Sequence, residues 1–257
     1  MRKAVFINTT AIIIINTLAV VCTWEKDMKL DMALDSVDDQ YIGCENEMYN
    51  LVKSKILKEE LGKRKLFKKV WNDYSNSTDD FERIIKVYTA ESRNKKGPLY
   101  KKLNEAVGSG RKNYRTKFKY KAFHFLLTRA LQIYKVPTCA EVFRRTNVSF
   151  ERKVSNQEMR FDRFASTSEI NNMNSFGNIS CFKIETCYGA NISNFSVYQG
   201  EKEVLIPPYE KFKITNITGS PNEMNCRVLY TLKSAGTCSN MNCELLNKKT
   251  LQVQMVM

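Results

Sequence analysis

Hydrophobic side chains recur at helical spacing through the segment from residue 31 to 135. The stretch from Lys53 to Trp71 is rich in Lys, Leu and Glu and contains few helix breakers. Two further sets follow helical spacing: Phe81, Ile84, Ile85 and Tyr88, and then Phe123, Leu126, Leu127, Ala130, Leu131 and Tyr134. The last set predicts an amphipathic helix, and Pro137 is expected to end it. We therefore expect the N-terminal half to be mostly helical.

Beyond Pro137 the pattern changes to short runs rich in Val, Ile, Phe and Tyr, separated by turn residues. Such runs are typical of strands. The expected strands are Glu141–Phe143, Arg160–Ala165, Ser180–Thr186, Asn194–Tyr198, Glu203–Ile206, Lys211–Ile217 and Cys226–Leu232. Helices followed by strands indicate an α+β fold rather than alternating βαβ units. No repeat or linker interrupts the sequence, so we expect one compact domain.

The N-terminus has the pattern of a secretory signal peptide. Arg2 and Lys3 precede an apolar core at residues 11–21, which is too short to span a bilayer comfortably. We expect residues 1–23 to be removed and residues 24–257 to form the domain. The C-terminal residues 250–257 are too short and too weakly apolar for a glycolipid-anchor signal. The mature chain is therefore expected to be secreted, without a transmembrane segment, and monomeric.

Cysteine usage agrees with secretion. The chain has eight Cys and one His, which favours disulfides in an oxidising compartment over a zinc site, so we expect no metal. Seven Cys remain beyond the expected signal peptide, so at least one is free or pairs between chains, and the sequence alone leaves the pairing open. Six Asn-x-Ser/Thr motifs support the same interpretation, at Asn76, Asn147, Asn178, Asn191, Asn194 and Asn216.

The charge of the chain raises a non-catalytic alternative. With 41 basic and 27 acidic residues the net charge is +14, and the Lys-rich stretch at 53–69 could attract sulfated glycans or anionic lipid. A secreted protein without an evident groove of aromatic side chains is not expected to bind nucleic acid. A solvated cationic helix face is the simpler interpretation of the stretch.

Few residues offer catalytic chemistry. No glycine-rich phosphate loop follows a strand, and His124 lies among core positions of the amphipathic helix, where a structural role is expected. Glu201-Lys202-Glu203 is different because it lies in a turn led by Gly200 and leads directly into an apolar strand. Residues i and i+2 of an extended chain point to one side, so both carboxylates could face one cleft. Upstream, Arg144 and Ser166 each follow or end a predicted strand, and Arg is suited to hold a diphosphate.

This order of motifs resembles the arginine-specific mono(ADP-ribosyl)transferases of the vertebrate ectoenzyme type. The Arg144, Ser166-Thr167-Ser168 and Glu201-x-Glu203 motifs are collinear with the family's, and further matching stretches lie at residues 38–44, 120–131, 176–190 and 200–210. The resemblance covers about residues 30 to 245. It implies a single α+β domain with a helical N-terminal part, a C-terminal sheet and an NAD cleft, and transfer of ADP-ribose from NAD to arginine side chains of extracellular proteins.

The resemblance also implies a role for each matching residue. Glu203 corresponds to the catalytic glutamate and Ser166 to the serine that supports it. Glu201 would orient the acceptor guanidinium. Arg144 would hold NAD on its phosphate side, and the backbone of Arg145 would hold the carboxamide. Phe176 would stack on the nicotinamide ring.

The family's disulfide pattern implies Cys44–Cys243 and Cys139–Cys187, and leaves Cys181, Cys226 and Cys238 unassigned.

Two features of this sequence bear on the resemblance to the family's NAD cleft. Arg145 stands where some relatives have Gly, so its side chain could alter NAD binding. A glycan on Asn147 would have to point away from the cleft. An NAD glycohydrolase, with water as acceptor, would use the same site and remains the alternative to transfer, beside the cationic binding protein.

Overall fold

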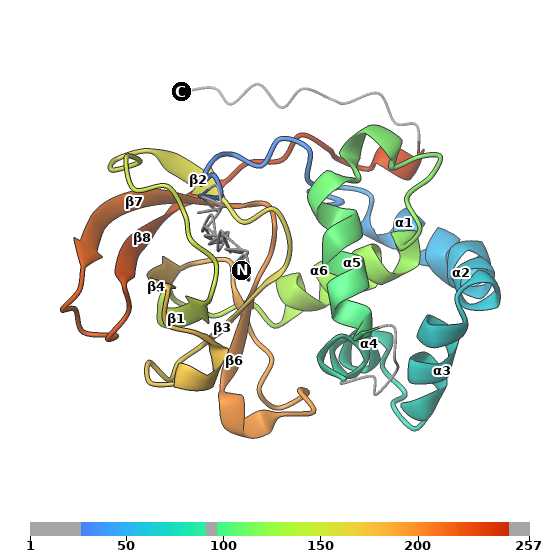
Figure 1. Ribbon diagram of the computed structural model, residues 1–257. Helices are drawn as coiled ribbons and strands as arrows, with labels where there is room; N and C mark the ends of the chain where they lie inside the picture. Colours follow the sequence, from blue (N-terminus) through green and yellow to red (C-terminus); the bar gives the residue numbers. More distant parts are fainter. Residues whose placement is uncertain (1–26, 91–96, 247–257) are drawn as a thin grey trace, which may run out of the picture.

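The computed structural model describes residues 27–90 and 97–246. The expected signal peptide and the C-terminal residues 250–257 lie outside the described residues. The helical half contains α1 (Glu45–Leu51), the π-helical η1 (Val52–Ile56), α2 (Leu57–Lys63), α3 (Lys65–Asp73), α4 (Asp80–Thr89), α5 (Leu99–Ser109) and α6 (Lys121–Ile133). Figure 1 shows these helices gathered on one side of the molecule and the sheet on the other.

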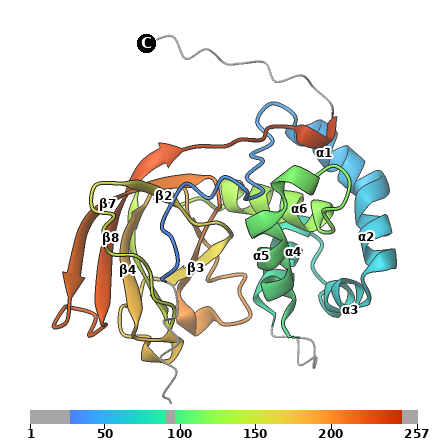
Figure 2. The same cartoon turned by 45° about the horizontal axis from the view of Figure 1, so that its top comes forward.

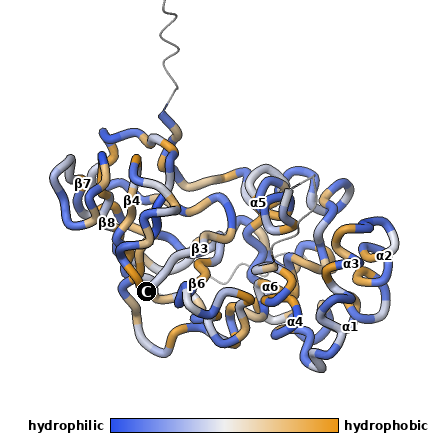
Figure 3. Tube along the Cα trace, turned by 60° about the horizontal axis from the view of Figure 1, so that its bottom comes forward, coloured by the Kyte–Doolittle hydropathy of each residue, from blue (hydrophilic) through white to orange (hydrophobic). Residues whose placement is uncertain are grey.

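Helix α6 is the centre of the helical half. Phe123, Leu127 and Leu131 are fully buried, as the amphipathic spacing predicts, and the helix packs against α4. Figure 3 shows hydrophobic chain segments in orange where these two helices lie. The Glu60 carboxylate accepts a hydrogen bond of 2.8 Å from the Ala122 backbone N–H at the start of α6. This bond satisfies a donor that the first helical turn would otherwise leave unpaired.

The helix expected from Lys53 to Trp71 is interrupted at Arg64. The backbone there leaves the helical region, with φ −125° and ψ 84°, so α2 and α3 are separate helices. The Arg64 guanidinium lies over the Tyr120 ring at 5.6 Å, and its Nε donates to the Lys119 carbonyl at 3.3 Å. Through these contacts the chain at Arg64 lies against the start of α6. The helical periodicity of residues 53–71 does not reveal this break, because the contacts involve residues of another segment.

The strands form one mixed sheet. Within the described residues it has eight strands in the order β2-β7-β8-β4-β1-β3-β6-β5, and only β4 and β8 pair in parallel. The bounds are β1 Ala140–Thr146, β2 Glu158–Arg160, β3 Ala165–Ser168, β4 Ser180–Thr186, β5 Ala190–Asn191, β6 Glu203–Ile206, β7 Glu210–Gly219 and β8 Val228–Thr237. The expected α+β class is confirmed, and β4 and β6 have the bounds that the sequence predicts.

Two predicted strands are wrong. The run Arg160–Ala165 is divided between β2 and β3. The chain bends at residues 161–164, where the Asp162 carbonyl accepts a hydrogen bond from the Ser36 hydroxyl at 2.7 Å instead of taking part in a ladder. The run Asn194–Tyr198 is a turn, in which the N–H groups of Phe195 and Ser196 bond back to the Ile192 carbonyl. Phe195 then packs on Tyr134, so its hydrophobicity reflects packing on the helical half.

The first and last described segments of the chain fasten the two halves together. The N-terminal segment in blue and the C-terminal segment in red both cross from the sheet to the helices (Figures 1 and 2). The Asp39 carboxylate accepts hydrogen bonds of 2.9 Å from the N–H groups of Tyr41, Cys243 and Glu244. The disulfide Cys44–Cys243 joins the same two segments.

Three disulfides are present in the described residues. Cys44–Cys243 and Cys139–Cys187 are the pairs that the resemblance implies. The third pair, left open by the sequence, is Cys181–Cys226, and Cys238 is a free thiol. Over residues 27–90 and 97–246, none of the helices has the length and apolar character needed to cross a bilayer. The same part of the chain contains no cluster of three or more His, Cys, Asp or Glu suited to a metal ion.

Candidate active site

A cleft of about 470 Å³ lies where the β1–β3–β6 part of the sheet meets α4 and α5. The structure brings all six predicted site residues to its lining: Arg144, Arg145, Ser166, Phe176, Glu201 and Glu203. Three strands far apart in sequence supply most of them, because β3 pairs with both β1 and β6. The helices close the opposite wall with Tyr88, Tyr100 and Asn104.

The two glutamates reach the cleft through a turn. Glu201 ends the short 3₁₀ helix Gln199–Glu201, and Glu203 begins β6. Lys202 between them has a left-handed backbone with φ 45°. The expected turn is confirmed and both carboxylates line the same cleft, but the expectation that they reach it as residues i and i+2 of an extended chain is wrong. The left-handed residue is the physical reason, since it breaks the alternation that i and i+2 would follow in a strand.

The Ser-Thr-Ser segment of β3 holds the Glu-x-Glu turn in place. Ser168 pairs with Glu203 across the β3–β6 ladder, and its hydroxyl donates to the Glu201 carbonyl at 2.6 Å. The Thr167 hydroxyl donates to the Val204 carbonyl at 2.5 Å. The Ser166 hydroxyl hydrogen-bonds the Glu203 side chain. Each of the three hydroxyls thus fixes a different part of the turn or its carboxylate.

Glu203 has an unusual protonation equilibrium. It is only 6% exposed, and burial raises the pKa of its carboxyl from the ordinary 4.5 to about 7, with the charge of Glu201 adding to the increase. The hydrogen bond from Ser166 and the charge of Arg144 both lower the pKa of Glu203. A carboxyl balanced in this way is characteristic of catalytic sites.

Arg144 supplies positive charge at the same place. It lies in β1, and its Nη1 donates to the Ser166 carbonyl at 2.7 Å. Burial lowers the pKa of Arg144, but a guanidinium remains protonated in proteins. The remaining N–H groups of a planar guanidinium can bind a phosphate or carboxylate through two parallel hydrogen bonds.

Two helical residues extend the hydrogen-bond network and were not singled out from the sequence. The Asn104 amide of α5 donates to the Tyr88 hydroxyl at 3.1 Å and to the Phe164 carbonyl at 3.2 Å. The Tyr88 hydroxyl in turn hydrogen-bonds the Ser166 side chain, and burial raises the pKa of Tyr88. Tyr88 follows the same helical spacing as its core neighbours, so only its position at the end of α4 could have suggested a second role.

The single histidine does not belong to this cleft lining. His124 is fully buried, with its Nδ1 at 2.8 Å from the Tyr41 hydroxyl and its Nε2 at 3.1 Å from the Val37 carbonyl. Burial lowers the pKa of His124 to about 4. The predicted structural role is confirmed, because a neutral histidine enclosed by the helical core cannot serve a nucleophile in the cleft.

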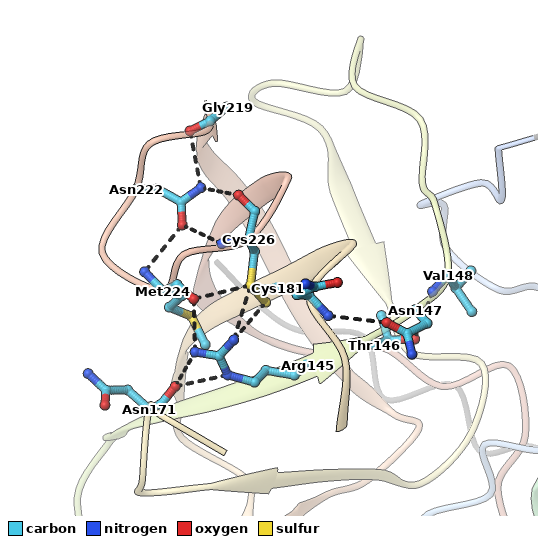
Figure 4. Close-up of a disulfide and its surroundings, with 11 residues drawn as sticks. Arg145, Thr146, Asn147, Val148, Asn171, Cys181, Gly219, Asn222, Met224 and Cys226 are labelled. Carbon is cyan, nitrogen blue, oxygen red and sulfur yellow. Dashed lines mark hydrogen bonds between the residues drawn. A yellow bond between two sulfur atoms is a disulfide. The ribbon is translucent and has the colours of Figure 1, made fainter. Parts of the chain in front are cut away.

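The last two candidates lie at the rim. Phe176 is 50% exposed, in the short 3₁₀ helix Asn174–Phe176. Arg145 turns its guanidinium toward the Cys181–Cys226 disulfide (Figure 4). Asn147, the nearby glycosylation motif, is exposed and is not among the cleft-lining residues.

Known proteins share both the sequence and the fold. The profile of a family described as NAD:arginine ADP-ribosyltransferase matches residues 30–237. Ecto-ADP-ribosyltransferase 5 from Homo sapiens is 35% identical over 87% of this chain and 84% of its own length. The erythroblast NAD(P)(+)–arginine ADP-ribosyltransferase from Gallus gallus is 32% identical over 87% of this chain and 78% of its own.

A solved structure agrees with these relatives. The crystal structure of a mutant of the eukaryotic mono-ADP-ribosyltransferase ART2.2 in complex with NADH superposes with a TM-score of 0.68 and 28% identity, covering 84% of this chain and 98% of that one. A second ART2.2 mutant, in complex with NAD, gives 0.67. From the match over residues 30–237 and these relatives, the chain belongs to the NAD:arginine ADP-ribosyltransferase family.

Proposed function

We propose that the protein transfers ADP-ribose from NAD to arginine side chains of other proteins and releases nicotinamide. One observation carries the proposal. The cleft holds two carboxylates beside a guanidinium, with Glu203 buried and bonded to Ser166 and Arg144 fixed by the Ser166 carbonyl. That arrangement suits a reaction in which a diphosphate must be held while positive charge develops nearby.

Glu203 would act on the ribose that loses nicotinamide. The bond between the ribose C1′ and the nicotinamide nitrogen breaks, the bonding electrons leave with neutral nicotinamide, and the ribose becomes cation-like. An ionised Glu203, accepting a hydrogen bond from the ribose 2′-hydroxyl, would stabilise that charge, as carboxylates do in glycoside cleavage. Arg144 would hold the diphosphate, the backbone of Arg145 the carboxamide, and Phe176 would lie against the nicotinamide ring.

Glu201 would handle the acceptor. A guanidinium is a poor nucleophile while protonated, so a nearby carboxylate is needed to orient it and to take its proton as the new bond from nitrogen to C1′ forms. Glu201 lines the cleft two residues from Glu203. Its backbone is fixed by Ser168, which supports a positioning role at the open side of the cleft.

We further propose that residues 1–23 are a signal peptide, that residues 24–257 form one catalytic domain, and that the protein is a secreted monomer acting on extracellular arginines. The three disulfides and the ectoenzyme relatives support this. N-terminal sequencing and light scattering of protein from a secretory host test it. An uncleaved N-terminus, a glycolipid-anchored product or a stable dimer would contradict the respective parts.

The assay that tests the activity uses NAD with agmatine, a free guanidine acceptor. Nicotinamide and ADP-ribosyl-agmatine are measured together for the wild-type chain and for Glu203→Gln. We expect both products from the wild type and neither from the variant. Nicotinamide without the agmatine adduct would replace transfer by NAD hydrolysis. No product from folded wild-type protein would refute the enzyme and leave the cationic binding role.

A further inference from the structure

The side chain of Arg145 lies on the third disulfide. Arg145 of β1 pairs directly with Cys181 of β4, so the two side chains share one face of the sheet. The Arg145 Nη1 is 3.3 Å from the Cys226 sulfur and 3.8 Å from the Cys181 sulfur. Burial lowers the pKa of Arg145, and Figure 4 shows its guanidinium enclosed between two loops.

The guanidinium joins these two loops through backbone carbonyls. Its Nε and Nη2 donate to the Asn171 carbonyl at 3.0 and 2.7 Å, and Nη2 also donates to the Met224 carbonyl at 2.9 Å. Asn171 belongs to the β3–β4 connection at residues 169–179, and Met224 to the β7–β8 loop at residues 220–227. A planar guanidinium can donate in two directions at once, whereas a lysine ammonium cannot reproduce that geometry.

The loop that contains Met224 is held by several hydrogen bonds and by a disulfide. The Asn222 amide oxygen accepts from the Met224 and Cys226 N–H groups at 3.2 Å, and its nitrogen donates to the Cys226 and Gly219 carbonyls at 2.7 and 3.1 Å. The Cys181–Cys226 disulfide ties the same loop to β4. Met224, Cys181 and Cys226 are all buried. The Met224 carbonyl is therefore a fixed point on the sheet.

The Asn171 side faces the cleft. The segment from 169 to 177 contributes Ile170, Met173 and Phe176 to the cleft lining. Its two ends are anchored: the Ile170 N–H bonds to the Ser168 hydroxyl at 2.9 Å, and Gly177, with φ 126°, lies so close to β1 that a Cβ there would be 2.5 Å from the Thr146 backbone. Arg145 adds a side-chain anchor at Asn171, near the start of this wall.

We propose that Arg145 and the Cys181–Cys226 disulfide form a clamp that positions the 169–177 segment, and thereby Phe176, for NAD. This inference rests on the proposed function, and it assigns Arg145 a positioning role through its side chain in addition to any contact of its backbone. The clamp acts on the affinity for NAD rather than on bond cleavage, because other contacts hold Glu203 and Ser166. Glu203 pairs with Ser168 across the β3–β6 ladder, and the Ser166 carbonyl accepts a hydrogen bond from Arg144.

The test compares Arg145→Ala, Arg145→Lys and the matched control Arg227→Ala. Arg227 is an exposed arginine beside β8 that donates to the Ser149 hydroxyl at 3.0 Å. If the loop occupies its binding position about a tenth of the time without the clamp, the KM for NAD rises about tenfold. We expect that rise in Arg145→Ala with kcat within about twofold of wild type, a smaller rise in Arg145→Lys, and no change in Arg227→Ala.

Hydrogen exchange without NAD separates the clamp from the proposed function. Backbone amides of residues 169–177 should exchange faster in Arg145→Ala than in wild type or in Arg227→Ala, whether or not the protein is an enzyme. Unchanged exchange would overturn the clamp. Inactive wild-type protein with accelerated exchange in Arg145→Ala would refute the proposed function and leave the clamp as a structural element.

A double-mutant cycle with the disulfide completes the test. The Cys181→Ala/Cys226→Ala variant removes the disulfide that ties the Met224 loop to β4 but keeps Arg145. In that background Arg145→Ala should raise the KM for NAD by a smaller factor than it does in the wild type, because the two parts act as one unit. An equal factor in both backgrounds would overturn the proposal, as would a fall in kcat with unchanged KM. Should Arg145→Ala fail to fold, Arg145→Lys takes its place in the cycle.

Discussion

The pH dependence of the reaction is the most quantitative consequence of the site. A carboxyl with a pKa of about 7 is about one-eleventh ionised at pH 6 and about ten-elevenths ionised at pH 8, so kcat/KM for NAD should rise about tenfold between them. The sign follows from the proposed role, since only the ionised Glu203 stabilises a cation-like ribose. His124 does not interfere with this rise, because its pKa is lowered to about 4.

Replacing Ser166 by Ala tests the cause of this profile. The Ser166 hydroxyl lowers the pKa of Glu203, and a hydrogen bond to a charged group contributes about 1.5 kcal/mol, or about one pKa unit. The acidic limb of the profile should therefore move up by about one pH unit in Ser166→Ala. Initial rates with saturating agmatine, measured from pH 5 to 9 for the wild type and for Ser166→Ala, locate the acidic limb of each profile.

Glu60→Gln is the matched control for this experiment. Burial also raises the pKa of Glu60 to about 7, but Glu60 lies at the start of α6 and does not line the cleft. Its removal should leave the limb in place, with folding checked by circular dichroism at each pH. A wild-type limb near pH 4.5, or a limb that disappears in Glu60→Gln, would refute the assignment to Glu203.

Three further variants test separate parts of the site and fold. Glu201→Gln should lose transfer to agmatine while some release of nicotinamide to water survives; equal loss of both would mean that Glu201 does more than position the acceptor. Tyr88→Phe removes the hydroxyl between Asn104 and Ser166 and should lower kcat about tenfold through misplacement of Ser166, with an unchanged kcat counting against the network. Asp38→Ala leaves the buried Arg160 guanidinium unpaired and should lower the free energy of unfolding in urea by about 3–5 kcal/mol. Glu158→Ala removes an ion pair with Lys211 that is more exposed, and it should change the free energy of unfolding by less than about 1 kcal/mol. Equal losses of stability in Asp38→Ala and Glu158→Ala would refute the conclusion that burial makes the Asp38–Arg160 pair the more important one.

The sequence predicts the parts of this fold that local patterns control. The helical spacing of α6 corresponds to its buried face. The short apolar runs at β4 and β6, separated by turn residues, correspond to strands with mostly buried side chains. The break at Arg64 and the turn at Asn194–Tyr198 depend on contacts with Tyr120 and Tyr134. Those partners are distant in sequence, and no local pattern contains them.

The candidate site divides in the same way. The order of Arg144, Ser166 and Glu203 along the sequence matches a family motif, so it indicates the site without a structure. In the fold, β3 brings the three residues together because it pairs with both β1 and β6. Tyr88 and Asn104 come from α4 and α5. The apolar spacing of these helices predicts buried positions, and it does not show that a polar group at such a position reaches the cleft. The direction of the Arg145 side chain follows from its pairing with Cys181, which becomes visible only once the register of β1 and β4 is known.

In the proposed mechanism, Glu203 stabilises the reacting ribose and is not required to hold NAD. The most direct test measures NAD binding by calorimetry and nicotinamide release by initial rates on the same preparation of Glu203→Gln. We expect a Kd within about threefold of wild type and a rate reduced at least about a hundredfold. A rate close to that of the wild type, or a loss of rate that weaker NAD binding fully explains, would contradict this role of Glu203.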